Sequence, residues 1–174
     1  HLSCKIMAIL EPLKIRIISK GNAVPYYLAK PFQKALHGIM REMPVFRLIG
    51  QPLCPTMLVD IAEGALSREL WCSIDYKSST DGLSAKLSRL LMEAVTEGFH
   101  PEFQEVIQKT LRPHRCEYPL CRDKDGKKLD EIKPVVQKNG QLMGSITSFP
   151  ILCLANLGLY ILTQRRLGRQ ETPD

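Results

Sequence analysis

The sequence predicts an α+β fold, and two kinds of pattern support that prediction. Short runs rich in strand formers occur at residues 13–18, where apolar and polar residues alternate, and at residues 70–74, which are mainly apolar. Longer segments at residues 31–43, 81–95 and 102–111 carry apolar residues at helical spacing. The chain has no internal repeat or low-complexity tract, and its 174 residues are enough for one core or one and a half.

The composition is that of a soluble globular protein, with 44% hydrophobic residues. The first ten residues lack the pattern of a secretory signal, and the chain starts without Met and ends on a polar tail, so we expect a piece of a longer protein. Six cysteines show no paired spacing, which predicts a reducing, intracellular setting. These cysteines are at positions 4, 54, 72, 116, 121 and 153.

The positive charge is concentrated in the first third of the chain. Residues 1–50 carry eight Lys and Arg against two Glu, whereas residues 51–174 carry sixteen of each sign. This asymmetry indicates a polyanionic partner, although a merely solvated basic surface is the alternative. The excess alone does not separate RNA, DNA, nucleotide phosphates or an acidic membrane face.

Lys14 and Arg16 are predicted to project from the same face of the strand at residues 13–18. Two neighbouring cations on a rigid strand can hold a triphosphate. The alternative is a charged outer face on an edge strand, where Lys discourages unwanted pairing.

Asp75 and Asp81 mark a change from strand to helix periodicity. Asp75 follows the predicted strand at residues 70–74, where a carboxylate at a strand end can bind a metal ion. Asp81 and Ser84 are expected in the first turn of the following helix, because their oxygens can accept from free backbone donors. The alternative is that Asp75 starts a turn and Asp81 only caps a helix.

The other elements follow from turn and breaker residues. We expect a helix that begins at Pro31 and stops at Pro44, a short strand at residues 45–49 and a helix from Thr56 towards Leu70. An Asp-Gly turn within residues 112–138 predicts a hairpin.

Three residues are candidate metal ligands. His114, Cys116 and Cys121 are close in sequence, but their spacing is irregular and a fourth ligand is missing, so structural or incidental roles are favoured over zinc.

A glycine-containing loop at residues 140–148 leads into a helix that has Pro150 in its first turn and is apolar all round. Such a helix is expected to be buried, and Asn156 interrupts it too early for a convincing membrane span. The Asn156 amide should therefore have a partner, either a backbone carbonyl, Asp81 or a bound sugar.

Three of these stretches resemble motifs F, A and B of viral RNA-dependent RNA polymerases, in that order. The closest resemblance is to the ourmia-like (botourmiavirus) polymerases of plant and fungal positive-strand RNA viruses, relatives of the narnaviruses, mitoviruses and leviviruses. The matching residues are Lys14-x-Arg16 within residues 11–21, Asp75-x5-Asp81, and residues 140–150 with Gly144, Thr147 and Ser148. Residues 23–28 and 46–50 also look like that group, so the resemblance covers nearly the whole chain.

The resemblance implies a right-hand polymerase with antiparallel palm strands packed on helices. Residues 1–69 would be a fingers-type segment, and residues 70–174 a palm segment with residues 112–138 as an insertion. The implied partners are RNA template and product and ribonucleoside triphosphates, with Mg²⁺, or alternatively Mn²⁺, as cofactor. No membrane span and no obligate protein partner are implied, and the implied location is the host cytoplasm, with the mitochondrion as a second possibility.

The resemblance also assigns roles to single residues. Asp75 would bind the catalytic metal, and Lys14 and Arg16 would hold the triphosphate. Asp81 with Asn156 would sense the ribose 2′-hydroxyl. The remaining motif B residues would form the mobile loop that seats template and nucleotide; they are Gly144, Thr147 and Ser148.

One departure from the family is the absence of the Gly-Asp-Asp of motif C from these 174 residues. We therefore expect the isolated chain not to polymerise. Two alternatives stay open: a non-catalytic RNA-binding remnant, and another palm enzyme such as a reverse transcriptase. Asp81 and Asn156 argue against the second, because they suit a 2′-hydroxyl sensor better than a bulky steric gate.

Overall fold

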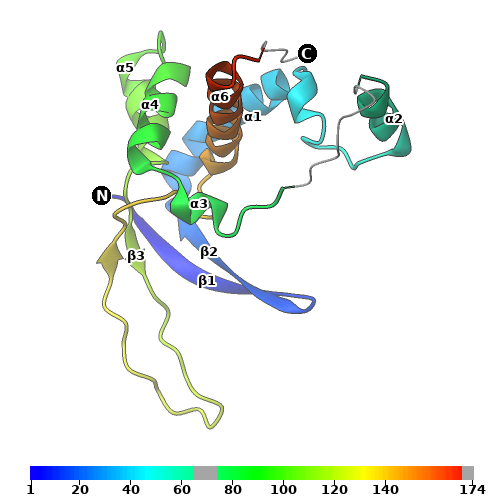
Figure 1. The fold of residues 1–174 in the computed structure, drawn as a ribbon. Coiled ribbons are helices and arrows are strands. Elements are labelled where there is room, and N and C mark those ends of the chain that lie inside the picture. Colours follow the sequence, from blue (N-terminus) through cyan, green and yellow to red (C-terminus); the bar gives the residue numbers. More distant parts are fainter. Residues whose placement is uncertain (65–73, 170–174) are drawn as a thin grey trace.

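The computed structural model describes residues 1–64 and 74–169 (Figure 1). Helices lie at one end of the molecule, and a small sheet extends from them. The elements in chain order are β1 (Ser3–Glu11), β2 (Lys14–Gly21), α1 (Ala23–Arg41), the 3₁₀ turn η1 (Pro44–Phe46), α2 (Pro55–Gly64), α3 (Ser79–Gly82), α4 (Ala85–Val95), α5 (Pro101–Lys109), β3 (Arg115–Glu117), β4 (Val135–Val136) and α6 (Ser148–Arg166).

The sheet has the strand order β2-β1-β3-β4 and is mixed. Strands β1 and β2 form an antiparallel hairpin through a two-residue turn in which Leu13 has a φ of 69°. Strand β3 pairs in parallel with β1, with Cys4 opposite Cys116, and antiparallel with β4. Within the predicted palm segment β3 and β4 are antiparallel, as expected, whereas β3 pairs in parallel with β1 of the predicted fingers-type segment. The long helical connection between these strands gives the chain enough length for a parallel crossover.

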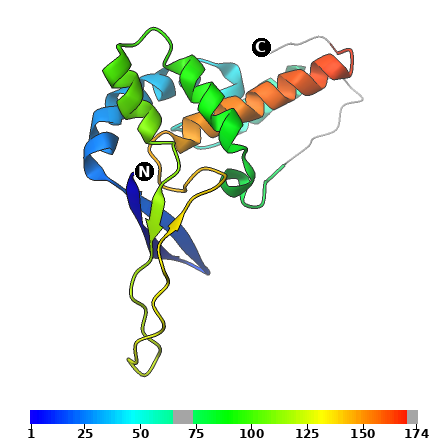
Figure 2. The same cartoon turned by 90° about the vertical axis from the view of Figure 1, so that its left-hand side faces the viewer.

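The hydrophobic core is helical. Its buried residues are Ala29 and Phe32 of α1, Met92 of α4, Ile107 of α5 and Ile151 of α6. Figure 2 shows α4, α5 and α6 gathered above the sheet, and α1 contacts both α5 and α6. The buried residues of this cluster are all helical, whereas Cys4 of β1, Ser19 of β2 and Cys116 of β3 are buried in the sheet. The two predicted segments, 1–69 and 70–174, share this core and the sheet.

Two helices begin elsewhere than predicted. Helix α1 begins at Ala23, because the Asn22 side chain accepts a hydrogen bond from the Val24 amide at 3.2 Å and caps it, and Pro31 lies inside the helix. Helix α4 begins after Ser84, whose hydroxyl accepts from the Leu87 amide at 3.4 Å. The Ser84 cap is therefore confirmed, whereas Asp81 belongs to the separate one-turn helix α3.

The predictions for residues 45–74 have mixed outcomes. The strand at residues 45–49 is wrong, since η1 and turns occupy this stretch. Helix α2 is present over Pro55–Gly64, and the rest of the helix predicted towards Leu70 lies outside the described residues. Most of the predicted strand at residues 70–74 lies outside the described residues, and Ile74 is exposed and in no strand.

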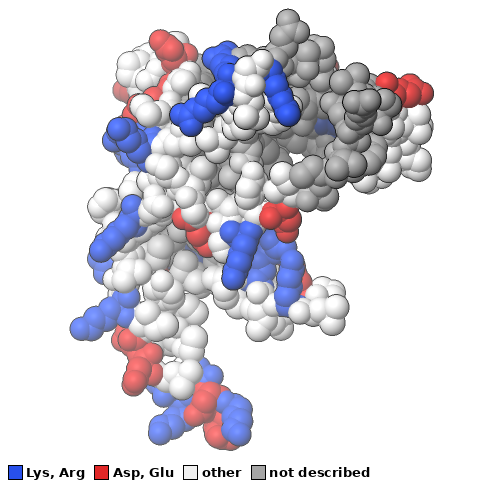
Figure 3. All heavy atoms as spheres, in the orientation of Figure 1, with Lys and Arg blue, Asp and Glu red and all other residues white. Residues whose placement is uncertain are grey.

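Residues 112–138 form the predicted hairpin, which projects from the helical end (Figures 1 and 2). Strands β3 and β4 pair at its base. Further out, the backbones of Arg122 and Lys128 form an isolated antiparallel β-bridge. The Asp123 carboxylate closes the turn by accepting from the Asp125 and Lys127 amides at 3.0 and 2.9 Å. Acidic and basic side chains mix at the far end of the hairpin (Figure 3), so this end has no single-sign field.

Helix α6 is only partly buried. Ile151 and Ala155 face the core, but Leu159 and Tyr160 are about half exposed. The prediction of a fully buried helix is therefore wrong for its second half. Among the described residues, no helix has the length and apolar character needed to cross a membrane.

Candidate functional site

The loop at residues 139–148 lies between β2 and α3 and brings together three segments that the sequence singled out. The Ser19 amide and hydroxyl of β2 both donate to the Met143 carbonyl at 2.7 Å. The Gln141 amide donates to the Thr80 carbonyl of α3 at 2.8 Å. The strand with Lys14 and the short helix with Asp81 are thus joined through this loop.

Two glycines make this close approach possible. Gly144 has a φ of 111°, and a Cβ there would lie 2.3 Å from the Ser19 carbonyl oxygen. Gly140 has a φ of 72°, and its Cβ would lie 2.6 Å from the Asp81 carbonyl oxygen. Since both conflicts involve backbone atoms, a side chain at either position would push the loop away from its neighbour.

Buried side-chain hydrogen bonds hold the loop from its inner side. The Gln141 amide group donates to the Ser88 hydroxyl at 3.0 Å and accepts from the Ser148 hydroxyl at 2.7 Å. The Thr147 hydroxyl lies 2.7 Å from that of Thr110. The hydroxyls of Thr147 and Ser148 therefore face the interior in this structure.

Lys14 and Arg16 lie on one face of β2, and Glu11 contacts both. The Arg16 guanidinium donates to Glu11 at 2.8 and 3.3 Å, and the Lys14 ammonium lies 3.6 Å from the same carboxylate. The hydrogen bond from Arg16 is the main reason why the pKa of the Glu11 carboxyl is lowered. Lys and Arg side chains gather over this hairpin beside acidic groups (Figure 3).

Asn156 faces α3 across a cavity of about 270 Å³ whose lining includes Ser79 and Gly82. Within the described residues no hydrogen bond joins its amide to Asp81, which is exposed. Asp75 is also exposed, and the residue after it, Tyr76, lines the same cavity. The structure thus places Asn156 beside the Asp75–Asp81 stretch, although their polar groups are not paired.

A complete metal site is not formed by the described residues. Residues 1–64 and 74–169 contain no group of three or more His, Cys, Asp or Glu that could hold a metal ion. Mg²⁺ is often bound by one or two carboxylates together with phosphates and water, so Asp75 could supply one ligand.

The trio of His114, Cys116 and Cys121 is not assembled. Cys116 is buried and its sulfur lies 3.7 Å from that of Cys4, whereas Cys121 is exposed. Burial, with a hydrogen bond to Cys116, raises the pKa of the Cys4 thiol to about 12. A raised pKa leaves the Cys4 sulfur mainly as the less reactive thiol, and both cysteines are buried where β1 pairs with β3.

Sequence reasoning missed three residues that shape this site: Ser19, Glu11 and Gln141. Ser19 could have been found from its place in an alternating strand, and Glu11 from its position opposite Lys14 once β1 is recognised as a strand. Gln141 carries no such signal, because nothing in a polar loop residue indicates that it is buried.

The chain is similar to the curated RNA-dependent RNA polymerase of Ourmia melon virus (isolate Melon/Iran/VE9). The two are 29% identical over 185 residues, which cover 98% of this chain and 21% of that protein. The chain thus spans about a fifth of the length of this relative. No protein-family model matches the chain, and no solved structure matches it. The similarity supports a relation to viral RNA-dependent RNA polymerases.

Proposed function

We propose that the chain is part of an RNA-directed RNA polymerase that replicates the genome of a positive-strand RNA virus of the ourmia-like group. The observation that carries the proposal is the similarity to a viral polymerase along 98% of the chain. The loop at residues 139–148 supports it, because it joins the segments that resemble motifs F, A and B. The proposed partners are an RNA template, its product and ribonucleoside triphosphates, in the host cytoplasm.

Lys14 and Arg16 are proposed to bind the triphosphate of the incoming nucleotide. Glu11 holds both cations on one face of β2 and keeps them oriented before a nucleotide arrives. These ion pairs are exposed, so they cost little to exchange for contacts with a phosphate. A phosphate near this face would receive a point charge from Lys14 and a planar pair of donors from Arg16.

Asp75 is the proposed metal ligand of this chain. Mg²⁺ or Mn²⁺, when bound, would supply the positive charge that stabilises the phosphate undergoing transfer. Asp81 and Asn156 are proposed to distinguish ribonucleotides through the 2′-hydroxyl. The cavity that Asn156 lines is open to a polar group of this size, and the half-buried amide can both donate and accept.

The loop with Gly144, Thr147 and Ser148 is proposed to seat template and nucleotide. Its contact with Ser19 fixes the distance between the cationic strand and the loop, so nucleotide position depends on both.

The test is primer elongation by the polymerase encoded by the complete parent reading frame, with RNA template, Mg²⁺ and nucleotides. Replacement of a metal ligand removes several kcal/mol of charge stabilisation, so Asp75→Asn should slow elongation by about a hundredfold or more. Asp125→Asn, at the exposed turn of the hairpin, is the matched control and should elongate normally. Elongation by the Asp75→Asn enzyme at the wild-type rate would refute the proposal.

A second measurement uses the 174-residue chain alone. Because one metal-bearing carboxylate is present, we expect no elongation above background. Elongation that depends on Asp75 would contradict this expectation. A parent reading frame whose product binds RNA yet never elongates would instead favour the non-catalytic remnant.

A further inference from the structure

A second cavity, of about 300 Å³, lies between α4, α5 and the start of the loop at residues 137–140. Its volume is at the lower end of the range for small-molecule pockets. Its walls include Ala85, Arg89, Met92, Leu111 and Arg112. Asn139 and Gly140 at the start of the candidate loop line it, but the residues proposed above to bind nucleotide or metal do not, so the cavity adjoins the candidate site without sharing those residues.

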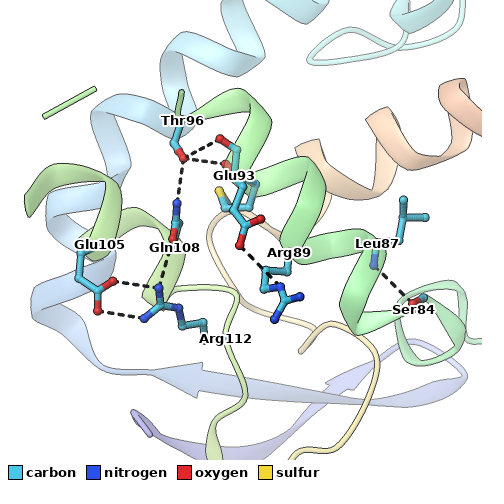
Figure 4. Close-up of polar contacts among 9 residues, drawn as sticks. Ser84, Leu87, Arg89, Glu93, Thr96, Glu105, Gln108 and Arg112 are labelled. Atoms are coloured by element: carbon cyan, nitrogen blue, oxygen red, sulfur yellow. Dashed lines mark hydrogen bonds and ion pairs between the residues drawn. The ribbon is translucent and has the colours of Figure 1, made fainter. Parts of the chain in front are cut away.

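The cavity is cationic. Lys86, Arg89, Arg112 and Lys138 line it, and no Asp or Glu is among its described lining residues. Figure 4 shows that Arg112 is held by Glu105, with a contact of 2.9 Å, and that Arg89 approaches Glu93 at 3.6 Å. Neither Lys86 nor Lys138 forms an ion pair within the part of the chain that the structure describes. Two ammonium groups are therefore available for an anion.

The interior of the cavity suits a flat, mainly apolar body with a few polar edges. Ala85, Leu111 and Met92 supply apolar contacts. The guanidinium of Arg112 is held in place by the Glu105 carboxylate and the Gln108 amide oxygen, so its plane is available for stacking on a ring. The Asn139 amide oxygen accepts from the Ala85 amide at 3.0 Å, which leaves the amide NH₂ to donate to a ligand.

We propose that this cavity binds a nucleoside phosphate, with the base between Leu111 and the Arg112 plane and the phosphate on Lys86 and Lys138. Phosphate matches the two ammonium groups as point charges, and a base matches the apolar walls and the stacking surface. Fatty acids share the negative charge but have no planar ring to stack on the guanidinium. The same chemistry is present in a free nucleotide and in a unit of an RNA strand. The proposal rests on the cavity and its charges, and it does not depend on the polymerase assignment.

The experiment is a calorimetric titration of the 174-residue chain with adenosine 5′-monophosphate. Removal of both ammonium groups in a Lys86→Gln, Lys138→Gln double variant should weaken binding about tenfold or more. The matched control is Lys124→Gln with Lys127→Gln, which removes the same charge from the exposed hairpin end and should leave binding unchanged.

The role of the interior is tested by filling it. Ala85→Leu keeps every charge but occupies part of the cavity, and it should weaken binding of the mononucleotide by a similar factor. Ala94→Leu, on the exposed side of the same helix, is its control. Ribose 5-phosphate, which lacks the base, should bind wild-type protein more weakly than the mononucleotide.

A titration with an oligoadenylate decamer distinguishes the two sources of the ligand, an RNA strand and a free nucleotide. Binding of the decamer much more tightly than the mononucleotide, with the same loss in the pocket variants, supports an RNA strand; equal affinity supports a free nucleotide. The proposal is overturned if the pocket variants bind like wild type, or if ribose 5-phosphate binds as well as the mononucleotide. Loss of binding only in a Lys14→Gln, Arg16→Gln variant would place the nucleotide on β2 and likewise overturn it.

Discussion

Replacement of Gly144 by Ala tests the contact between the loop and β2. The new Cβ would lie 2.3 Å from the Ser19 carbonyl oxygen, and this backbone atom cannot rotate away. A non-glycine residue at positive φ costs about 1–2 kcal/mol. Displacement of the loop also breaks two Ser19–Met143 hydrogen bonds, each worth about 0.5–1.5 kcal/mol. The sum is about 2–5 kcal/mol, a large share of the 5–15 kcal/mol that typically stabilises a domain.

The free energy of unfolding is measured by urea denaturation followed by far-ultraviolet circular dichroism. Gly158→Ala is the control, because Gly158 lies inside α6 with no atom within 4 Å of an added Cβ. This control should gain about 0.5–1 kcal/mol from its higher helix propensity. Ser19→Ala removes one of the two hydrogen bonds and should lose about 1 kcal/mol.

The reasoning is refuted if Gly144→Ala unfolds within about 0.5 kcal/mol of wild type, the range of ordinary surface substitutions. It is also refuted if the Gly158→Ala control loses as much stability as Gly144→Ala, since the effect would then not be specific to the close approach.

Two further predictions concern buried polar groups. Gln141→Leu leaves the Ser148 hydroxyl without its acceptor and should reduce the free energy of unfolding by about 1–3 kcal/mol; urea denaturation with no change in midpoint would contradict this. Burial lowers the pKa of His114, whose Nδ1 donates to the Arg112 carbonyl, so the unfolded chain binds a proton more readily. Stability should therefore fall as the pH drops below about 6.5, and His114→Gln should flatten this dependence. An unchanged pH profile in the variant would show that other groups cause it.

The helices that could be predicted from the sequence are those whose formation depends on their own residues alone. Helix α5 (Pro101–Lys109) lies close to the predicted range 102–111, because a segment with one apolar face at helical spacing needs no information from elsewhere in the chain. The start of α1 was misplaced because Pro31 resembles a helix start, whereas the Asn22 cap lies upstream and decides the boundary. The strand expected at residues 45–49 fails because strand propensity in a short run has no effect without a neighbouring strand.

In the candidate site, too, contacts between distant parts of the chain could not be predicted from the sequence. The sequence pointed to Gly144 and Thr147, but it could not show that Ser19 and Gln141 hold their loop, because those contacts join residues far apart in the chain. The pairing of Cys4 with Cys116 depends on a parallel strand contact and was invisible for the same reason.

The parallel contact between β1 and β3 also has a consequence for the order of folding during synthesis. Strand β1 can pair with β2 as soon as both leave the ribosome, because a two-residue turn joins them. Its other edge must wait for β3, which follows 112 residues later along the chain. At typical translation speeds that delay is on the order of ten seconds, during which an edge with open backbone groups is exposed. During this interval the nascent hairpin presents an edge to which a chaperone, or another strand, can bind.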